Sequence, residues 1–402
     1  MTEADARPLP LTGIKVLDLS KVLAGPLCTQ YLADMGASVI KVEAPGSGDD
    51  TRGWPPFRAP GLGAVFMNAN RGKRSIAIDL KSDEGRAVVH RLAKSCDIAI
   101  ESFGTGVAER LGIDRASLQA INPRLVHCSI SGFGRTGPMK NAPGYDVILQ
   151  AFSGMMAMTG EAGGPTVRSP ISPIDQATGL HALSGILAAL YARQQTGVAE
   201  AVEVSLFETA AGLMGYNIQS YWERGEMPAR FGTSHESLCP YQVFDASDGA
   251  VMIGVANDSL WRKFCAIAGL EEHVDDPRFA TNAMRVQNRA ATLEIVSAAV
   301  AEHSMAFWDS ELAKARVPCS PINDLPALLA HPHAQQSDLF LSYDKPGVGP
   351  LRGVAHPVKF GGRTRAASLP PPSLGEHTDA ILHDAGFSDD EVRALRSSRA
   401  VS

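Results

Sequence analysis

Asp175 is the carboxylate whose surroundings in the sequence best suit covalent chemistry. Pro170 and Pro173 precede it, and because the residue before a proline is driven out of helical space, they predict an extended lead-in. Apolar residues then recur every three or four positions over 180–190, which predicts a buried helix. We therefore expect a lone carboxylate at the helix N-terminus, where the ordinary role of an aspartate is that of an N-cap. The alternative is a nucleophile that the helix positions and keeps ionised, with space left by the small residues at 177–179.

The other chemical motifs in the chain are incomplete. The six cysteines form no C-x-x-C pair and the eleven histidines lack metal-ligand spacing, so we expect no metal site. No G-x-S-x-G nucleophile elbow occurs. The run 132–137 matches G-x-G-x-x-G, but Pro138 follows where a dinucleotide fold needs an opening helix, so we reject a nicotinamide site. What remains is an aspartate able to attack an activated acyl group, beside helix N–H groups able to stabilise an oxyanion.

Short apolar segments alternate with helices in the first half of the chain. Strands are predicted over 11–19, 37–42, 75–80, 97–100 and 125–130, with helices over 27–35 and 82–94. This alternation is typical of an α/β, doubly wound parallel sheet with right-handed crossovers. The loop 22–26 then lies at the carboxyl end of the first strand, where such sheets bind ligands. The basic cluster 71–74 is a candidate anion site, although a solvated surface is its ordinary explanation.

The composition changes near residue 225, which predicts a second, smaller α+β domain. A hairpin is expected over 241–254, followed by helices over 258–268, 290–303 and 305–315. Before this change, helices are expected over 145–158 and 206–222, and a strand over 201–204. The proline-rich segment from 326 onward is expected to return to the first domain and to end in a helix over 389–397. The predicted domains are therefore 1–224, 225–325 and a returning segment, 326–402.

The overall composition excludes several classes of protein. The 402 residues are 45% hydrophobic and 20% charged with a net charge of −6, which argues against a general nucleic-acid or anionic-membrane binder. No apolar run is long enough to span a membrane, and the N-terminal residues lack the pattern of a signal peptide. Scattered free cysteines suit a reducing compartment, so we expect a cytoplasmic protein. An anionic ligand would then need a local cluster of lysine and arginine.

Along nearly its whole length the sequence resembles the class III coenzyme A-transferase family, which includes formyl-CoA:oxalate and carnitine CoA-transferases. The matching motifs occupy 11–19, 22–26, 36–43, 48–52, 71–80, 129–134, 143–146, 150–154, 175–179 and 374–378. The segments 230–244 and 281–289 are similar to the branch that acts on succinyl-CoA and dicarboxylates such as glutarate. The resemblance implies a Rossmann-like large domain and a homodimer of two interlocked chains. It also implies acyl-CoA as a substrate, with no tightly bound cofactor.

The resemblance implies roles for individual residues. Asp175 matches the nucleophile, which forms an aspartyl anhydride and then an aspartyl-CoA thioester. Tyr145 matches a residue near the thioester. The candidate CoA-binding residues are Val22, Leu23 and Ala24 for the pantetheine and thiol, Ile78, Ser102 and Phe103 around the nucleotide, and Lys73, Arg74 and Arg110 for the phosphates.

The sequence also departs from the family in places. The oxalate-specific members carry a glycine-rich lid that 239–248 lacks, which argues against oxalate as the acceptor. Ala44 stands where a basic residue often contacts a phosphate. We expect His235 to line the acceptor site near the distal carboxylate of a dicarboxylate, its ordinary alternative being a surface loop histidine.

Three functions remain open. The favoured one is transfer of CoA from succinyl-CoA to a carboxylic acid, with a dicarboxylate as the expected acceptor. The second is an α-methylacyl-CoA racemase, but racemases place a histidine directly before the aspartate that matches Asp146. Here that residue is Tyr145, and a phenol is a poor base at neutral pH, while His127 and His181 lie in apolar runs. The third is a CoA-binding scaffold without turnover, against which the retained Asp175 counts.

Overall fold

The computed structural model describes residues 8–364 and 369–402, and the chain forms two compact units. Unit 1 comprises Met1–Ser153, Ser169–Ile218 and Gln336–Ser402, and unit 2 comprises Gly154–Arg168 and Gln219–Gln335. We predicted domain boundaries after residues 224 and 325, whereas the corresponding divisions in the structure fall after residues 218 and 335. The segment Gly154–Arg168, which we assigned to the first domain, groups with unit 2.

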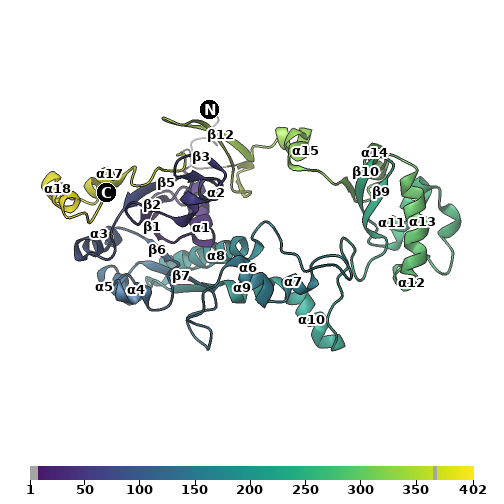
Figure 1. The fold of residues 1–402 in the computed structure, drawn as a ribbon, viewed down its shortest axis with the longest axis horizontal. Helices are drawn as coiled ribbons and strands as arrows, with labels where there is room; N and C mark the ends of the chain where they lie inside the picture. Colours follow the sequence, from purple (N-terminus) through teal and green to yellow (C-terminus); the bar gives the residue numbers. More distant parts are fainter. Residues whose placement is uncertain (1–7, 365–368) are drawn as a thin grey trace. The chain divides into compact units, whose positions relative to one another are not determined.

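Unit 1 is built on a six-stranded sheet in which every neighbouring pair of strands is parallel (Figure 1). The order across the sheet is β5-β2-β1-β6-β7-β8, so the chain first adds strands on one side of β1 and then on the other. The two strands where this direction changes are β1 and β6. The strands are β1 Lys15–Leu19, β2 Ser38–Glu43, β5 Lys73–Ala77, β6 Ile98–Glu101, β7 Val126–Ser131 and β8 Ala201–Ser205. The predicted parallel α/β sheet is confirmed.

Helices cover both faces of this sheet (Figure 1) because its strands are apolar on both. On one face, Leu17 and Leu19 of β1 join a core with Val88 of α3, Leu118 of α5 and Ile381 of α17. On the other face, α1 packs on β1 and β2, and α8 packs on β7 and β8. The helices assigned wholly to unit 1 are α1 Ala24–Asp34, α2 Ala64–Ala69, α3 Asp83–Ala93, α4 Val107–Arg110, α5 Arg115–Ile121, α6 Asp146–Phe152, α8 Pro173–Thr196, α9 Leu206–Leu213, α17 Thr378–Asp384 and α18 Asp389–Ser397.

Two predicted helices are divided in the structure. The helix expected over 145–158 ends with α6, because Gly154 adopts a left-handed conformation (φ 87°) before a separate turn, α7 Met155–Met158. The helix expected over 206–222 is α9 followed by α10 Gly215–Arg224, and the break falls where glycine weakens helical continuity. The prediction of one continuous helix was wrong in both places.

The start of α8 also differs from the prediction. Pro173 is the first helical residue, where its missing N–H costs nothing, rather than part of an extended lead-in. Ser172 is the N-cap, in a left-handed conformation (φ 50°) and without a side-chain cap hydrogen bond. Asp175 therefore lies inside the first turn and is not the N-cap.

The remaining strands of unit 1 form short antiparallel pairs, β3 Phe57–Ala59 with β4 Leu62–Gly63, β12 Phe340–Lys345 with β13 Gly349–Val354, and β14 Lys359–Phe360 with β15 Arg363–Thr364. After the last pair, the C-terminal segment lies along β5. The His377 N–H donates to the Ser75 carbonyl at 3.0 Å, and the Asp79 N–H donates to the Ala400 carbonyl at 2.9 Å. This segment therefore contributes to the first unit's sheet edge.

Unit 2 has its own small antiparallel sheet, β11-β10-β9, and its own core. The rings of Trp261, Phe264 and Trp308 stack in series, with centroids 6.0 and 5.9 Å apart. The predicted hairpin and three helices are confirmed. The elements are β9 Tyr241–Ala246, β10 Gly249–Gly254, β11 Cys319–Pro321, α11 Asp258–Ala268, α12 Asn282–Gln287, α13 Arg289–Ala301, α14 Met305–Ala315, α15 Leu325–Ala330 and α16 Pro332–Gln335.

The described residues contain neither a membrane-spanning helix nor a cluster of metal ligands. Within 8–364 and 369–402, no helix has the length and apolarity needed to cross a membrane. Over the same residues, no group of three or more histidine, cysteine, aspartate or glutamate side chains is arranged to hold a metal ion.

Candidate active site

A pocket of about 400 Å³ lies in unit 1 at the carboxyl ends of β1, β6 and β7. Asp175 lines it together with residues that follow each of these strands. The strand order explains the location, because the loops after β1 and β6 diverge where the direction of strand addition changes. A hydrogen bond joins the two loops there, from the Lys21 N–H to Ser102 Oγ at 3.0 Å. Of the residues predicted for CoA, this pocket brings together Val22, Leu23, Ala24, Ser102, Phe103 and Tyr145.

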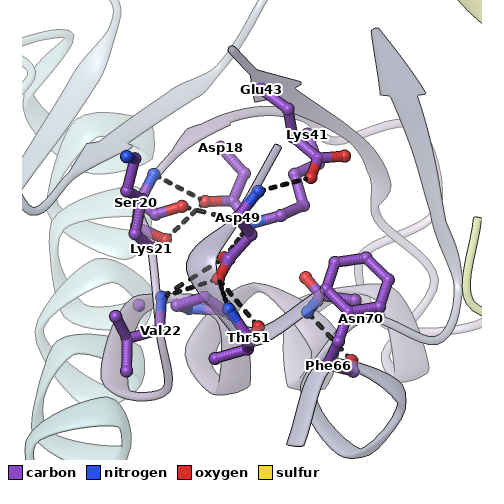
Figure 2. Close-up of polar contacts among 12 residues, drawn as sticks. Asp18, Ser20, Lys21, Val22, Lys41, Glu43, Asp49, Thr51, Phe66 and Asn70 are labelled. Carbon is purple, nitrogen blue, oxygen red and sulfur yellow. Dashed lines mark hydrogen bonds and ion pairs between the residues drawn. The ribbon is translucent and has the colours of Figure 1, made fainter. Parts of the chain in front are cut away.

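The loop after β1, of which Figure 2 labels Ser20, Lys21 and Val22, has an unusual conformation where it lines the pocket. Val22 has a φ of 69°, which is rare for a β-branched residue. Gly25 lets the loop fold back tightly, because a Cβ at this position would lie 2.3 Å from Ser20 Cβ. α1 begins at Ala24 with Leu23 as N-cap, and the described residues provide no side-chain cap hydrogen bond there. The first turn of α1 therefore opens onto the pocket.

Glycine also sets the distance between α1 and α8. A Cβ on Gly179 would lie 2.6 Å from the Ala24 carbonyl oxygen, so only glycine allows the two helices to approach this closely. Gly179 stands one turn after Asp175 in α8. The close approach therefore fixes Asp175 next to the first turn of α1.

A second carboxylate, Asp146, holds the start of α8. Its Oδ2 atom accepts hydrogen bonds from the N–H groups of Ile174 at 2.8 Å and Asp175 at 3.1 Å. Asp146 is buried at the start of α6, and Gln150 donates to its Oδ1 atom. Asp175 is thus not the lone carboxylate that we expected. The N–H groups of Ile174 and Asp175 are also occupied, which removes them as donors to an oxyanion.

Asp175 has a raised pKa. Burial first, and then the like charge of Asp146, raise the pKa of Asp175 from 3.8 to about 7. We expected the helix N-terminus to keep this carboxylate ionised, but burial and the charge of Asp146 raise its pKa instead. The carboxyl therefore titrates near neutral pH, as groups that take part in chemistry often do.

An arginine that sequence reasoning missed, Arg135, supports the segment after β6. Its guanidinium donates to the Phe103 carbonyl at 2.8 Å, to Glu101 Oε1 at 2.6 Å and to Ser129 Oγ at 3.0 Å. Glu101 in turn accepts the Phe103 N–H at 2.7 Å. Both polar groups of the Phe103 backbone are therefore fixed. Arg135 follows β7, so the rule that ligands bind at the carboxyl ends of strands was the signal for it.

The glycine-rich run 132–137 contributes Gly132 and Arg135 to the pocket wall. No helix follows it until α6 begins at Asp146, as we expected when rejecting a nicotinamide site. A Cβ on Gly132 would lie 2.9 Å from Gly144 Cα, so the backbone at the two ends of the loop between these glycines is in close contact. Both glycines line the pocket, next to Tyr145.

Four of the predicted CoA contacts, Lys73, Arg74, Ile78 and Arg110, do not line the pocket. Lys73 is fully buried and pairs with Asp18 at 3.0 Å, so its ammonium is a structural charge and not a phosphate ligand. Burial lowers the pKa of Lys73 to about 8, although Asp18 opposes this. Arg74 pairs with Asp384 of α17 at 2.6 Å and ties down the C-terminal segment. Ile78 is buried in the core and does not line the pocket.

Other cations surround the pocket. Lys21 and Lys140 are exposed and line it, and both lie on loops at the carboxyl ends of strands. Arg110 does not line it but is exposed at the end of α4, a few residues beyond Thr105 of the pocket. Lys21 and Lys140 therefore place positive charge at the pocket, whereas Lys73 does not. Sequence reasoning missed the two lysines because they stand alone rather than in a basic cluster.

His235 belongs to unit 2. Its Nδ1 atom accepts the Ser237 N–H at 3.1 Å, and its ring meets Tyr241 edge to face. Arg289 fixes the backbone by donating to the carbonyls of His235 and Glu236, at 3.0 and 2.7 Å. The loop that carries His235 is thus held in place within unit 2.

Comparisons with known proteins agree with this geometry. The family CoA-transferase family III matches residues 11–378. The succinate–glutarate CoA-transferase of Agrobacterium fabrum is 38% identical, with 95% of this chain and 97% of that protein covered. The human succinyl-CoA:glutarate CoA-transferase is 35% identical, with 95% and 87% covered. The crystal structure of a CAIB/BAIF family protein from Brucella suis superposes with a TM-score of 0.83 at 37% identity, over 94% of this chain and 100% of that one. The chain therefore belongs to CoA-transferase family III and is a CoA-transferase of that class.

Proposed function

We propose that this enzyme transfers coenzyme A from succinyl-CoA to a dicarboxylate such as glutarate, with Asp175 as the covalent nucleophile. One observation carries the proposal: Asp175 shares a single pocket with the loop 22–24 and the segment 102–103. These two segments resemble the CoA-binding segments of the family. The two relatives named for glutarate support the choice of acyl groups.

The first half of the reaction moves CoA onto the enzyme. A carboxylate oxygen of Asp175 attacks the thioester carbonyl carbon, the C–S bond breaks, and CoA leaves as a thiolate from a succinyl–aspartyl anhydride. The thiolate then attacks the aspartyl carbonyl carbon. The C–O bond to succinate breaks, which releases the succinate carboxylate and leaves Asp175 joined to CoA as a thioester.

The second half reverses these steps with the acceptor. An acceptor carboxylate attacks the aspartyl thioester and displaces the CoA thiolate, giving a new anhydride. The thiolate attacks the acceptor's acyl carbon, so the acceptor leaves as its CoA thioester and Asp175 leaves as a carboxylate. No net proton is taken up or released.

The pocket offers groups for the developing charges. The first turn of α1 lacks a side-chain cap among the described contacts, so its N–H groups at Ala24 and Gly25 can donate hydrogen bonds to the thioester oxygen. The exposed Lys21, Lys140 and Arg110 are the candidates for the phosphates of CoA. In unit 2, His235 is the proposed contact for the distal carboxylate of the acceptor.

Trapping tests the nucleophile. The protein is incubated with succinyl-CoA and then with hydroxylamine, and peptides are analysed by mass spectrometry. We expect a hydroxamate on Asp175 alone, which is absent without succinyl-CoA, and no CoA transfer by Asp175→Ala. Full transfer by Asp175→Ala would overturn the mechanism.

A panel of carboxylic acids tests the acceptor. With succinyl-CoA as donor, we expect glutarate to be converted with a higher kcat/KM than oxalate or a monocarboxylate of the same length. His235→Gln should raise the KM for glutarate without raising it for the monocarboxylate. A preference for monocarboxylates would show that the proposed acceptor class is wrong.

The racemase alternative gains no specific support from the described residues. His127 is buried, burial lowers its pKa to about 4, and it lines a different cavity. His181 hydrogen-bonds Thr209 Oγ1 at 3.1 Å through Nδ1. A racemase would exchange the α-hydrogen of a 2-methylacyl-CoA for deuterium in heavy water, and we expect no such exchange.

We also propose that two chains form a homodimer. Large aromatic side chains are exposed on the single chain, including Tyr216 at 75% and Trp222 at 70%, and exposed apolar surface of this kind favours association. Light scattering during gel filtration should give twice the chain mass. A monomer at micromolar concentration would contradict this proposal.

A further inference from the structure

A buried ion pair lies directly behind the pocket loop. Lys41 on β2 and Asp49 in the following loop are both fully buried, and Lys41 Nζ donates to Asp49 Oδ2 at 3.0 Å. Burial alone would raise the pKa of Asp49, but Lys41 and the hydrogen bonds from Thr51 outweigh it and lower the pKa. Asp49 is therefore an ionised carboxylate in the interior, where such a charge is stable only with partners.

Both partners of this pair hold the pocket loop (Figure 2). The Val22 N–H lies 3.2 and 3.4 Å from the two carboxylate oxygens of Asp49. Lys41 Nζ also donates to the Ser20 carbonyl at 3.1 Å. The ion pair therefore holds a carbonyl and an N–H group on the backbone of this loop.

Asp49 is itself held rigidly. Its N–H donates to Glu43 Oε1 at 3.1 Å, and Thr51 donates to Asp49 Oδ1 from both its N–H and its hydroxyl. Arg52 in turn donates to both oxygens of Glu43 at 2.7 Å. The Asp49 carboxylate thus has little freedom to follow the loop.

The loop needs such support because Val22 is strained. A β-branched residue with a φ of 69° persists only where its surroundings over-determine that conformation. Asp49 supplies the contact to the N–H of that very residue. The next residues, Leu23 and Ala24, line the pocket beside Asp175.

We propose that Asp49, supported by Lys41, is a positioning residue for acyl-CoA: it holds Val22 in its left-handed conformation and thereby gives the loop 21–24 its binding form. Asp49 does not line the pocket among the described residues, so it acts through the loop and not on the substrate. The inference rests on the proposal that this pocket binds acyl-CoA.

The test compares Asp49→Asn with a matched control, Asp34→Asn. Asp34 is equally buried and pairs with Arg71 at 2.5 Å, but at the other end of α1, away from the loop. We expect Asp49→Asn to raise the KM for succinyl-CoA and the dissociation constant of coenzyme A by about tenfold, with kcat within about twofold. Asp34→Asn should leave the KM for succinyl-CoA and the dissociation constant of coenzyme A unchanged, although it lowers Tm. Equal effects of the two variants on KM would overturn the inference.

A double-mutant cycle separates positioning from general damage. Glycine adopts positive φ without strain, so Val22→Gly removes the strain that Asp49 offsets. If Asp49 acts through Val22, the increase in KM in the double variant is smaller than the product of the two single increases. If the increase in KM of the double variant equals the product of the two single increases, Asp49 does not act through Val22.

The proposed function and this inference fail in different ways. If Asp175→Ala still transfers CoA, the proposed mechanism is wrong whatever Asp49 does. The inference alone is wrong if Asp175→Ala is inactive but the Asp49→Asn variant, although folded, binds coenzyme A as tightly as the unmodified enzyme does.

Discussion

The carboxylate of Asp146 accepts the backbone N–H of Asp175 at 3.1 Å, so one aspartate caps the helix turn that carries the other. This relationship has two consequences. It fixes the first turn of α8, and it places a second negative charge beside Asp175, which together with burial raises its pKa to about 7. Asp146 thus positions Asp175 and at the same time makes Asp175 a weaker acid.

The first prediction concerns the pH dependence of transfer. A nucleophilic Asp175 must be ionised, so kcat/KM for succinyl-CoA should rise with pH through an apparent pKa of about 7 and then level off. Asp146→Asn removes the like charge but keeps an oxygen that can cap α8. The half-maximum of the profile should therefore move to lower pH.

The control for this profile is Asp114→Asn. Asp114 caps α5 through the N–H groups of Ala116 and Ser117, but it does not line the pocket of Asp175. Its substitution should leave the profile in place. If the profiles of both variants coincide with that of the unmodified enzyme, Asp146 does not set the pKa of Asp175.

The second prediction concerns stability. The folded pKa of Asp175 lies above its unfolded value of 3.8, so the folded state binds more protons between about pH 4 and pH 7. The free energy of unfolding should therefore fall as pH rises through this window. Asp175→Asn removes the titration and should stabilise the protein at pH 8 by about 1–2 kcal/mol, after discounting for partial exposure of the carboxyl. Urea unfolding at pH 5 and pH 8 measures the difference, and an equal effect at both values would contradict the prediction.

The third prediction concerns Arg135. Arg135→Ala leaves Glu101 almost fully buried without its guanidinium partner and frees the Phe103 carbonyl. We expect the free energy of unfolding to fall by about 3–5 kcal/mol and the KM for succinyl-CoA to rise. The exposed pair of Arg393 and Asp390 serves as the control, since Arg393→Ala should cost about 1 kcal/mol or less. Similar losses in thermal unfolding for the two variants would argue against a supporting role for Arg135.

The fourth prediction concerns the contact between α1 and α8. Gly179→Ala places a Cβ 2.6 Å from the Ala24 carbonyl oxygen, so the helices must separate. The free energy of unfolding should fall by about 1–3 kcal/mol, and kcat/KM should fall with it. In α9, a Cβ on Gly212 meets no atom of the described residues within 4 Å, so Gly212→Ala should leave stability unchanged or improve it. If Gly179→Ala proves as stable and as active as Gly212→Ala, the close approach of the two helices is unimportant.

Much of the secondary structure could be predicted because it is a local property. The apolar periodicity and turn residues predicted α11, α14 and α18 with the bounds that the structure has. The same local reasoning joined α6 to α7, because a short, apolar and methionine-rich run conceals the left-handed turn at Gly154. The family, and with it the class of reaction, also followed from motifs in their order along the chain.

The environment of the site could not be predicted in the same way. The basic cluster 71–74 suggested a phosphate site, yet Lys73 points into the interior of the sheet because Asp18 on β1 lies there to pair with it. The sequence around Asp175 does not predict a raised pKa, because Asp146 is 29 residues away in the sequence and contacts Asp175 only after α6 and α8 pack. The sequence around Val22 does not predict its left-handed conformation either, because that conformation depends on contacts from Asp49.

The sequence by itself thus determined the order of strands and helices, the family and the identity of the candidate nucleophile. Only the tertiary structure decided which charged groups are buried in pairs, which line the pocket, and which acidity and backbone conformation the site residues adopt. The physical reason is that hydrogen bonding and burial act between residues that are close in space, whereas periodicity records only neighbours along the chain.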